Sequence, residues 1–264
     1  MLVGVSGKIG SGKDTVGDIF QALSGDFEIK KFADTLKDTA CLWLGCTREQ
    51  LEDREFKEKE LGEEWWYTYG RKYNKDILVP IIDMDEDFKT NPNAVIEKLT
   101  PRKLLQLLGT DCGRDIIHPN IWVNALFSEY KESKPPKAEE VFDYYHSECV
   151  DCRQSFNGYK RQFICNSCYD SHDWFPNWII TDMRFPNELK AVKDRGGISI
   201  RVDRDNEQVL KDKGIHIPKH LITPEHSSET ALDNAEFDYT IDNNGTIEEL
   251  IEKVREILIR ERII

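Results

Sequence analysis

The sequence contains no long hydrophobic run, and this excludes one class of protein. No apolar stretch among its 264 residues approaches the roughly 20 residues that a membrane-spanning helix needs. The N-terminal segment also lacks the basic start and the long apolar stretch of a signal peptide, because glycines and lysines follow Met1 within a few residues. We therefore expect a cytoplasmic protein that does not act at a membrane.

The sequence also lacks an excess of positive charge. It has 49 Asp and Glu against 36 Lys and Arg, which gives a formal net charge of −13. A surface of this sign repels a long polyanion, so we expect no stable binding to nucleic acid. A small phosphorylated substrate is still compatible with the sequence, because a local group of arginines can overcome a negative field.

Short apolar segments alternate with helical patterns along most of the chain. Strands are expected at 1–6, 27–33, 178–182, 198–202 and 237–242, and helices at 35–45, at 187–195 and after Thr246, where Glu249 completes a capping box. A further helix is expected to run from Pro101 to Gly109. This order predicts an α/β fold of three layers, with a parallel sheet covered on both faces. We expect one domain over 1–264; the stretch 47–98 stays unassigned.

A glycine-rich segment follows the first expected strand and precedes a helix. It contains the pattern G-x-x-x-x-G-K, formed by Gly7, Gly10, Ser11, Gly12, Lys13, Asp14 and Thr15 with the residues between them. Glycines allow a tight turn whose backbone N–H groups face one anion, and the helix N-terminus adds its dipole. Lysine reaches the β- and γ-phosphates as a point charge. The segment therefore predicts a P-loop that binds ATP.

One position departs from the usual P-loop pattern. Asp14 follows Lys13, where a serine or threonine normally contacts Mg²⁺. We expect Mg²⁺ to be held by Asp14 directly or through water, and Asp182, at the end of an apolar strand, to orient the metal shell. Arginines that grip phosphate are expected in loops: Arg114, Arg184, Arg201 and Arg204.

Several segments together resemble the bacteriophage-type deoxynucleoside monophosphate (dNMP) kinases, a branch of the P-loop nucleoside monophosphate kinases. They are the Gly-Lys-Asp-Thr end of the P-loop, Phe32–Lys37, Pro101–Asp111 with Arg114, Trp122-Val123, Thr181–Glu188, His226–Glu229 and Asp242–Thr246. The segments lie in order and span most of the chain outside 47–98 and 131–176.

The resemblance implies an enzyme that transfers the γ-phosphate of ATP to a dNMP, giving ADP and a dNDP, in the host cytoplasm if a phage encodes it. Arg114 and Arg184 would hold the acceptor or transferring phosphate, and Lys37 and Arg102 would lie on the acceptor side. Arg204 with Arg201 would form a lid, and the loop Asn243–Gly245 would lie near the adenine. A homodimer is plausible for this family.

Four of the seven cysteines fall within twenty residues of one another: Cys149, Cys152, Cys165 and Cys168. Two C-x-x-C pairs separated by twelve residues are typical of a closed Zn²⁺ site with four thiolate ligands. We therefore expect a small zinc-ribbon-like insertion at 141–175 with a structural metal and no catalytic part.

Two other readings of the residues are open. The acceptor of a P-loop kinase could be another phosphorylated metabolite or a modified base in DNA. Alternatively, the chain could be a nucleotide-dependent DNA-binding protein, although the acidic balance disfavours this. Which bases are accepted, and whether deoxyribose is preferred to ribose, does not follow from the sequence.

Overall fold

A computed structural model describes residues 1–72, 75–80, 84, 86, 95–133, 144–149, 151–159, 165, 167, 175–205 and 230–264. The chain divides into two compact units. The first combines Met1–Lys30 with Phe127–Ile264, and the second is Lys31–Leu126. Each unit is described by itself.

A parallel sheet forms the centre of the first unit. Its five strands in the described part of the chain lie in the order β2-β7-β1-β8-β9. They are β1 (Leu2–Ser6), β2 (Glu28–Lys30), β7 (Trp178–Met183), β8 (Ile198–Asp203) and β9 (Tyr239–Asp242). All five predicted strands are present, but the expected span 27–33 is wrong in length. The strand stops at Lys30 because the next N–H group, that of Lys31, bonds the Asp34 carboxylate instead of a strand.

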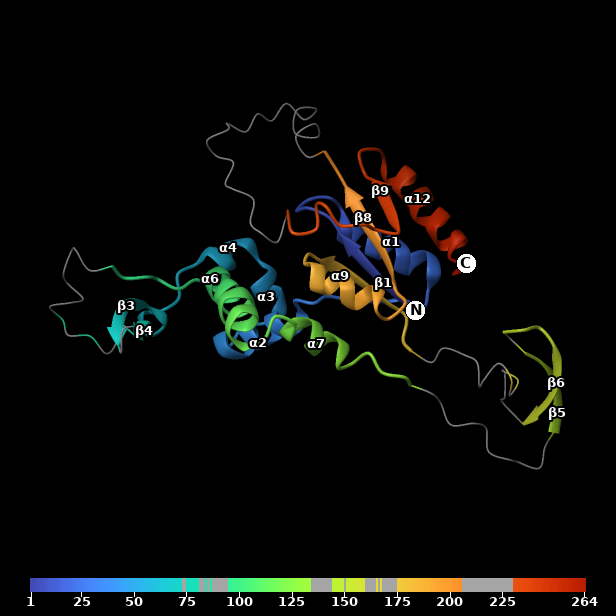
Figure 1. Cartoon of the computed structure of the whole chain (residues 1–264), viewed down its shortest axis with the longest axis horizontal. Coiled ribbons are helices and arrows are strands. Elements are labelled where there is room, and N and C mark those ends of the chain that lie inside the picture. The colour runs from blue at the N-terminus through green and yellow to red at the C-terminus, as the bar shows by residue number, and fades with distance from the viewer. Residues whose placement is uncertain are drawn as a thin grey trace. The chain divides into compact units, whose positions relative to one another are not determined.

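Helices cover both faces of this sheet (Figure 1). They are α1 (Lys13–Ser24), α9 (Pro186–Lys193) and α12 (Ile247–Arg260). Val3 and Val5 of β1 pack against side chains of α1 and α12, which contact each other. Gly4 lies between them and faces the other way, since a Cβ there would meet Val192 of α9 at 3.1 Å. The three-layer α/β architecture expected from the sequence is therefore confirmed.

The capping box predicted at the start of α12 is present in full. The Thr246 side chain accepts a hydrogen bond from the Glu249 N–H, and the Glu249 carboxylate accepts one from the Thr246 N–H. Four apolar side chains of the helix are buried: Leu250, Val254, Ile257 and Leu258. Among the described residues, every helix is too short or too polar to span a lipid bilayer.

The second unit is mainly helical and includes part of the stretch that the sequence left unassigned. Its elements are α2 (Asp34–Leu44), α3 (Arg48–Glu52), α4 (Arg54–Glu58), the 3-10 helix η1 (Glu63–Trp65), β3 (Tyr67–Lys72), β4 (Lys75–Pro80), α6 (Pro101–Gln106), the π-helix η3 (Leu107–Ile117) and α7 (Ile121–Phe127), whose last residue belongs to the first unit. Strands β3 and β4 pair as an antiparallel hairpin. Thr100 caps α6 through the Lys103 N–H, as the sequence predicted.

The helix that begins at Pro101 does not end at Gly109, so that expectation is wrong. The chain continues as the π-helix η3 to Ile117. The indole N–H of Trp122 donates to the Gly109 carbonyl at 2.8 Å, and a Cβ on Gly113 would come within 2.9 Å of the same ring. The wide turns are therefore packed against a buried tryptophan. Arg114 consequently lies on a helix and not in a loop.

A small hairpin in the first unit precedes β7. It pairs β5 (Tyr144–Glu148) with β6 (Ser155–Tyr159) in antiparallel fashion. The remaining residues of the expected insertion at 141–175 are described only in part, so its boundaries stay a prediction.

The Trp122 indole provides a test of the π-helix. We expect Trp122→Phe to lower the free energy of unfolding by about 1–3 kcal/mol, because the buried Gly109 carbonyl loses its hydrogen-bond donor. Chemical denaturation measures this quantity. The matched control is Trp43→Phe, the same change at a half-exposed tryptophan of α2. Equal losses in the two variants would contradict the assignment.

Candidate functional site: a phosphate-binding turn

The turn between β1 and α1 has a backbone that only glycine adopts readily. Gly12 has φ of 95°, in the left-handed region. A Cβ on Gly12 would also lie 2.4 Å from the side-chain nitrogen of Asn243. That nitrogen donates to the Ser11 carbonyl at 2.8 Å. Asn243, which the sequence placed near the adenine, thus holds the turn itself.

Lys13 is the first residue of α1 and is only 8% exposed. Its ammonium group donates to the carbonyls of Gly7 at 2.7 Å and Lys8 at 2.9 Å. The positive end of the α1 dipole lies at the same point. The turn is therefore built to attract an anion.

Two further features of the turn fit a phosphate group. The Ser11 hydroxyl is buried, and it finds no hydrogen-bond partner among the described residues. Gly7 has no room for a side chain, since a Cβ would lie 2.4 Å from the Ser11 hydroxyl and from the Val202 carbonyl. A buried hydroxyl, an ammonium group and a helix N-terminus form a donor set suited to phosphate oxygens.

A cleft of about 400 Å³ opens beside this turn. It is lined by Lys8, Val202, Asp203, Arg204, Asp205, Asp242 and Asn244. Arg204, which the sequence predicted to bind the nucleotide, thus lines the cleft directly after β8. Gly245, the other residue expected near the adenine, lies in the loop between β9 and α12, as Asn243 and Asn244 do. A Cβ on Gly245 would collide with the Glu249 carboxylate.

The carboxyl end of β7 brings a second group to the phosphate-binding turn. Thr181 donates its hydroxyl hydrogen to the Asp14 carboxylate at 2.9 Å. Sequence reasoning assigned Asp182 to this position and missed Thr181. Asp182 is the next residue on the strand and is half-buried. The signal in the sequence was Asp14, because a carboxylate at this P-loop position needs a hydrogen-bond donor, and Thr181 on the neighbouring strand supplies one.

Arg184 follows β7, as the sequence predicted, and its backbone is held in place. The carboxylate of Glu188, only 1% exposed, accepts the N–H groups of Arg184 at 2.7 Å and Phe185 at 3.0 Å. Arg201 does not lie in a loop, so that expectation is wrong. It is inside β8 and pairs with the carboxylates of Asp203 and Asp233, each at 3.0 Å.

The remaining predicted cations belong to the second unit. Lys37 of α2 pairs with Glu52 at 2.5 Å, and Arg102 of α6 pairs with Glu58. Burial raises the pKa of Glu52, but hydrogen bonds from Lys37 and Lys57 outweigh it and lower the pKa to about 2. Arg114 is half-buried on η3. That Arg114 and Arg184 converge on one phosphate stays a prediction.

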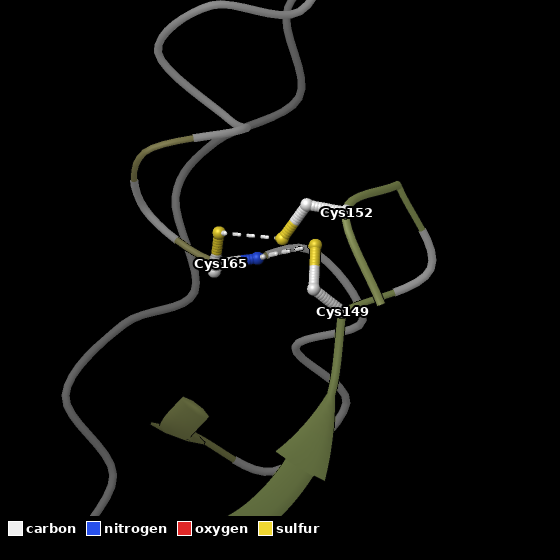
Figure 2. A group of neighbouring side chains, drawn as sticks. All are labelled: Cys149, Cys152 and Cys165. Atoms are coloured by element: carbon white, nitrogen blue, oxygen red, sulfur yellow. Dashed lines mark hydrogen bonds between the residues drawn. The ribbon is translucent and has the colours of Figure 1, made fainter. Parts of the chain in front are cut away.

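Three of the four predicted metal ligands lie together next to the β5–β6 hairpin. The sulfur atoms of Cys149, Cys152 and Cys165 are all within 4.8 Å of one another and point toward a common centre (Figure 2). Those of Cys152 and Cys165 are 3.9 Å apart. This distance is too long for a disulfide. It matches the spacing of about 3.8 Å that tetrahedral Zn–S bonds of about 2.3 Å impose. Cys168 lies outside the described residues.

Cys149 has the environment of a thiolate. Its sulfur is fully buried and accepts the Cys165 N–H at 3.4 Å. Backbone N–H groups of Cys152, Cys165 and Asp151 lower the pKa of the thiol to about 6, although burial opposes the shift. The chain turns around this sulfur with Arg153 at φ of 59°, a conformation uncommon outside glycine.

No protein-family model matches the chain. It is similar to a protein of Escherichia phage T5 named deoxynucleoside-5'-monophosphate kinase, with 25% identity over 88% of this chain and 85% of the relative. It is also similar to a protein of Acanthamoeba polyphaga mimivirus whose name gives deoxynucleotide monophosphate kinase as an inferred activity. That relative is 25% identical over 96% of this chain and 94% of its own length. The resemblance seen in the sequence motifs is therefore confirmed.

Proposed function

We propose that the protein is a dNMP kinase, which transfers the γ-phosphoryl group of ATP to a dNMP. The observation that carries the proposal is the phosphate-binding turn, with its buried ammonium group and a buried hydroxyl that finds no partner in the described part of the chain. The two similar proteins, named for this activity, supply the class of acceptor. Both substrates are small molecules, and no membrane or nucleic acid takes part. We expect the reaction in the cytoplasm, where ATP is available, and a homodimer is compatible with it.

The donor side is formed by the first unit. Gly7, Gly10, Ser11, Gly12, Lys13 and Thr15 would surround the ATP phosphates. The cleft beside the turn would take the adenosine end, since Asp203 and Asp242 can accept hydrogen bonds from ribose hydroxyls or the adenine amino group. Asp14 and Asp182 would hold the Mg²⁺ shell. The metal supplies charge neutralisation at the phosphate oxygens when it is bound.

The acceptor side would be formed by Arg114, Arg184, Lys37 and Arg102. Two phosphorylated substrates bring several negative charges into one cleft, and arginine forks offset the repulsion by bidentate contacts. Lys37 and Arg102 are already paired with glutamates in the second unit. A substrate phosphate would therefore compete with Glu52 and Glu58 for them.

The chemistry does not require a general base from the protein. A monophosphate has a second pKa of about 6, so its oxygen is mostly ionised at neutral pH. The oxygen attacks the γ-phosphorus, the bond from that phosphorus to the β–γ bridging oxygen breaks, and ADP leaves. The chain's residues only have to align the oxygens, neutralise charge and exclude water.

Lys13 provides the first test of this function. We expect Lys13→Ala to fold normally and to lose about 100-fold or more in kcat, because a buried charge aimed at the transferring phosphate is removed. Steady-state kinetics with ATP and a dNMP measure the loss. The control is Lys190→Ala, on the exposed face of α9. Near-normal kcat in folded Lys13→Ala would refute the donor site.

The two arginines test the acceptor side. We expect Arg114→Ala and Arg184→Ala each to lower kcat/KM by about tenfold or more, the effect of losing one charge-assisted contact. The loss should appear for every accepted dNMP, because all of them share the phosphate. Arg255→Ala, at a surface ion pair of α12, is the control. Unchanged kcat/KM in both variants would place the acceptor elsewhere, and a loss with one base alone would indicate a base contact.

The cysteine cluster is proposed to bind one structural Zn²⁺. A buried thiolate needs a cation, and the two other thiols within reach make a metal the natural counter-ion. Cys168 would be the fourth ligand, which closes the site and leaves no position for a substrate. The metal would then stabilise the 141–175 insertion without a catalytic part.

Metal analysis tests this proposal directly. We expect one Zn²⁺ per chain in the purified protein and its loss in Cys149→Ser/Cys165→Ser. The control is Cys41→Ser/Cys46→Ser, which changes two cysteines of the second unit and should keep the metal. Equal zinc content in the two double variants would show that the ligands are misassigned.

A further inference from the structure

The hydrogen bond between Thr181 and Asp14 joins the two elements that hold Mg²⁺ in P-loop proteins. In that large class a serine or threonine of the P-loop and an aspartate at the end of a neighbouring strand share the metal. Here the P-loop position after Lys13 carries a carboxylate, and the strand β7 carries a hydroxyl on Thr181 directly before Asp182.

Thr181 is held in one orientation by packing. It is 1% exposed, and its methyl carbon lies 2.4 Å from where a Cβ on Gly17 would be. A glycine inside a helix costs about 1 kcal/mol relative to alanine. Gly17 therefore leaves the space that the Thr181 methyl group occupies. A threonine has few side-chain rotamers, so the methyl group toward Gly17 fixes the hydroxyl toward Asp14.

The pairing of β1 with β7 is irregular next to the Thr181–Asp14 contact. The register between β1 and β7 shifts after Gly4, so that Ser6 pairs with Met183. The extra residue of the bulge falls in Thr181–Asp182, at the carboxyl end of the strand. Bulges re-aim side chains beside functional sites. This one occurs where the strand meets the phosphate-binding turn.

Asp14 is exposed at the start of α1. It lies in the first turn of α1, at the positive end of the helix dipole. A carboxylate has about four acceptor sites, so the bond from Thr181 does not use up its capacity for a cation.

We propose that Thr181 is a positioning residue, which aims the Asp14 carboxylate so that the P-loop supplies an acidic Mg²⁺ ligand in addition to Asp182. The inference rests on the proposed function only in taking MgATP as the phosphoryl donor. Thr181 acts through Asp14 and needs no contact with the substrate. Its contribution appears when Mg²⁺ accompanies ATP and vanishes when Mg²⁺ is absent.

The test measures ATP binding by calorimetry in Mg²⁺ and in EDTA. We expect Mg²⁺ to tighten ATP binding to the wild-type protein. Thr181→Val should weaken binding about tenfold in Mg²⁺, the size expected for one hydrogen bond to a charged group, and leave it unchanged in EDTA. Thr181→Ser keeps the hydroxyl but loses the methyl group that orients it, so it should bind MgATP more tightly than Thr181→Val, whereas Thr181→Ala should behave as Thr181→Val. Thr240→Val, at an exposed threonine of β9, is the matched control.

A double-mutant cycle identifies the path of the effect. In an Asp14→Ala background, Thr181→Val should cost nothing further, because the group that Thr181 positions is gone. A full additional loss in that background would overturn the proposal. So would equal binding by Thr181→Ser and Thr181→Ala in Mg²⁺, or wild-type binding that ignores Mg²⁺.

The outcome is separable from that of the kinase assignment. A protein that shows the Mg²⁺ effects above but phosphorylates no dNMP retains Thr181 as a positioning residue and loses the proposed function. A protein that phosphorylates dNMP, with a Thr181→Val variant that binds MgATP normally, gives the opposite result and overturns the inference.

Discussion

The buried ammonium group of Lys13 is the constraint on which the rest of the site depends. Its side chain is 8% exposed and donates to the carbonyls of Gly7 and Lys8, so a positive charge is held at the N-terminus of α1. The turn around it has the shape that this placement requires. Gly12 adopts a positive φ so that the turn can close, and Asn243 fixes the turn through the Ser11 carbonyl. The N-terminus of α1 and the buried hydroxyl of Ser11 belong to the same turn as the ammonium group.

Charged groups are stabilised in a different way in each part of the chain. The first unit places carboxylates and cations together at the carboxyl ends of β8 and β9, as the lining of the cleft beside the turn shows. In the second unit, cations pair with carboxylates on neighbouring helices, as Lys37 with Glu52 and Arg48 with Asp38 show. In the cysteine cluster, backbone N–H groups take the place of charged partners. The N–H group of Cys165 bonds the Cys149 sulfur, and such bonds lower the pKa of that thiol. The net charge of −13 therefore describes none of these sites.

Much of the first unit could be predicted from the sequence, because its signals are local. Apolar runs defined the five strands, and Thr246 with Glu249 defined the start of α12. The features that were missed depend on contacts between distant residues. The helix from Pro101 passes Gly109 because Trp122 supplies a donor thirteen residues later. Thr181 meets Asp14 across 167 residues, which no local pattern reveals. The hairpin β3–β4 was missed because the stretch 47–98 gave no clear periodicity.

The central claim is that a phosphoryl group moves from ATP to a dNMP. Tracing a label on the γ-phosphate of ATP into the products tests this claim most directly. The protein with Mg²⁺ and ATP labelled at the γ-phosphate would be incubated with each of the four dNMPs, with each ribonucleotide NMP and with DNA, and the products separated. The account predicts labelled dNDP in stoichiometric amounts with ADP for at least one dNMP. Label that enters DNA, or ADP release that no monophosphate stimulates, would contradict it.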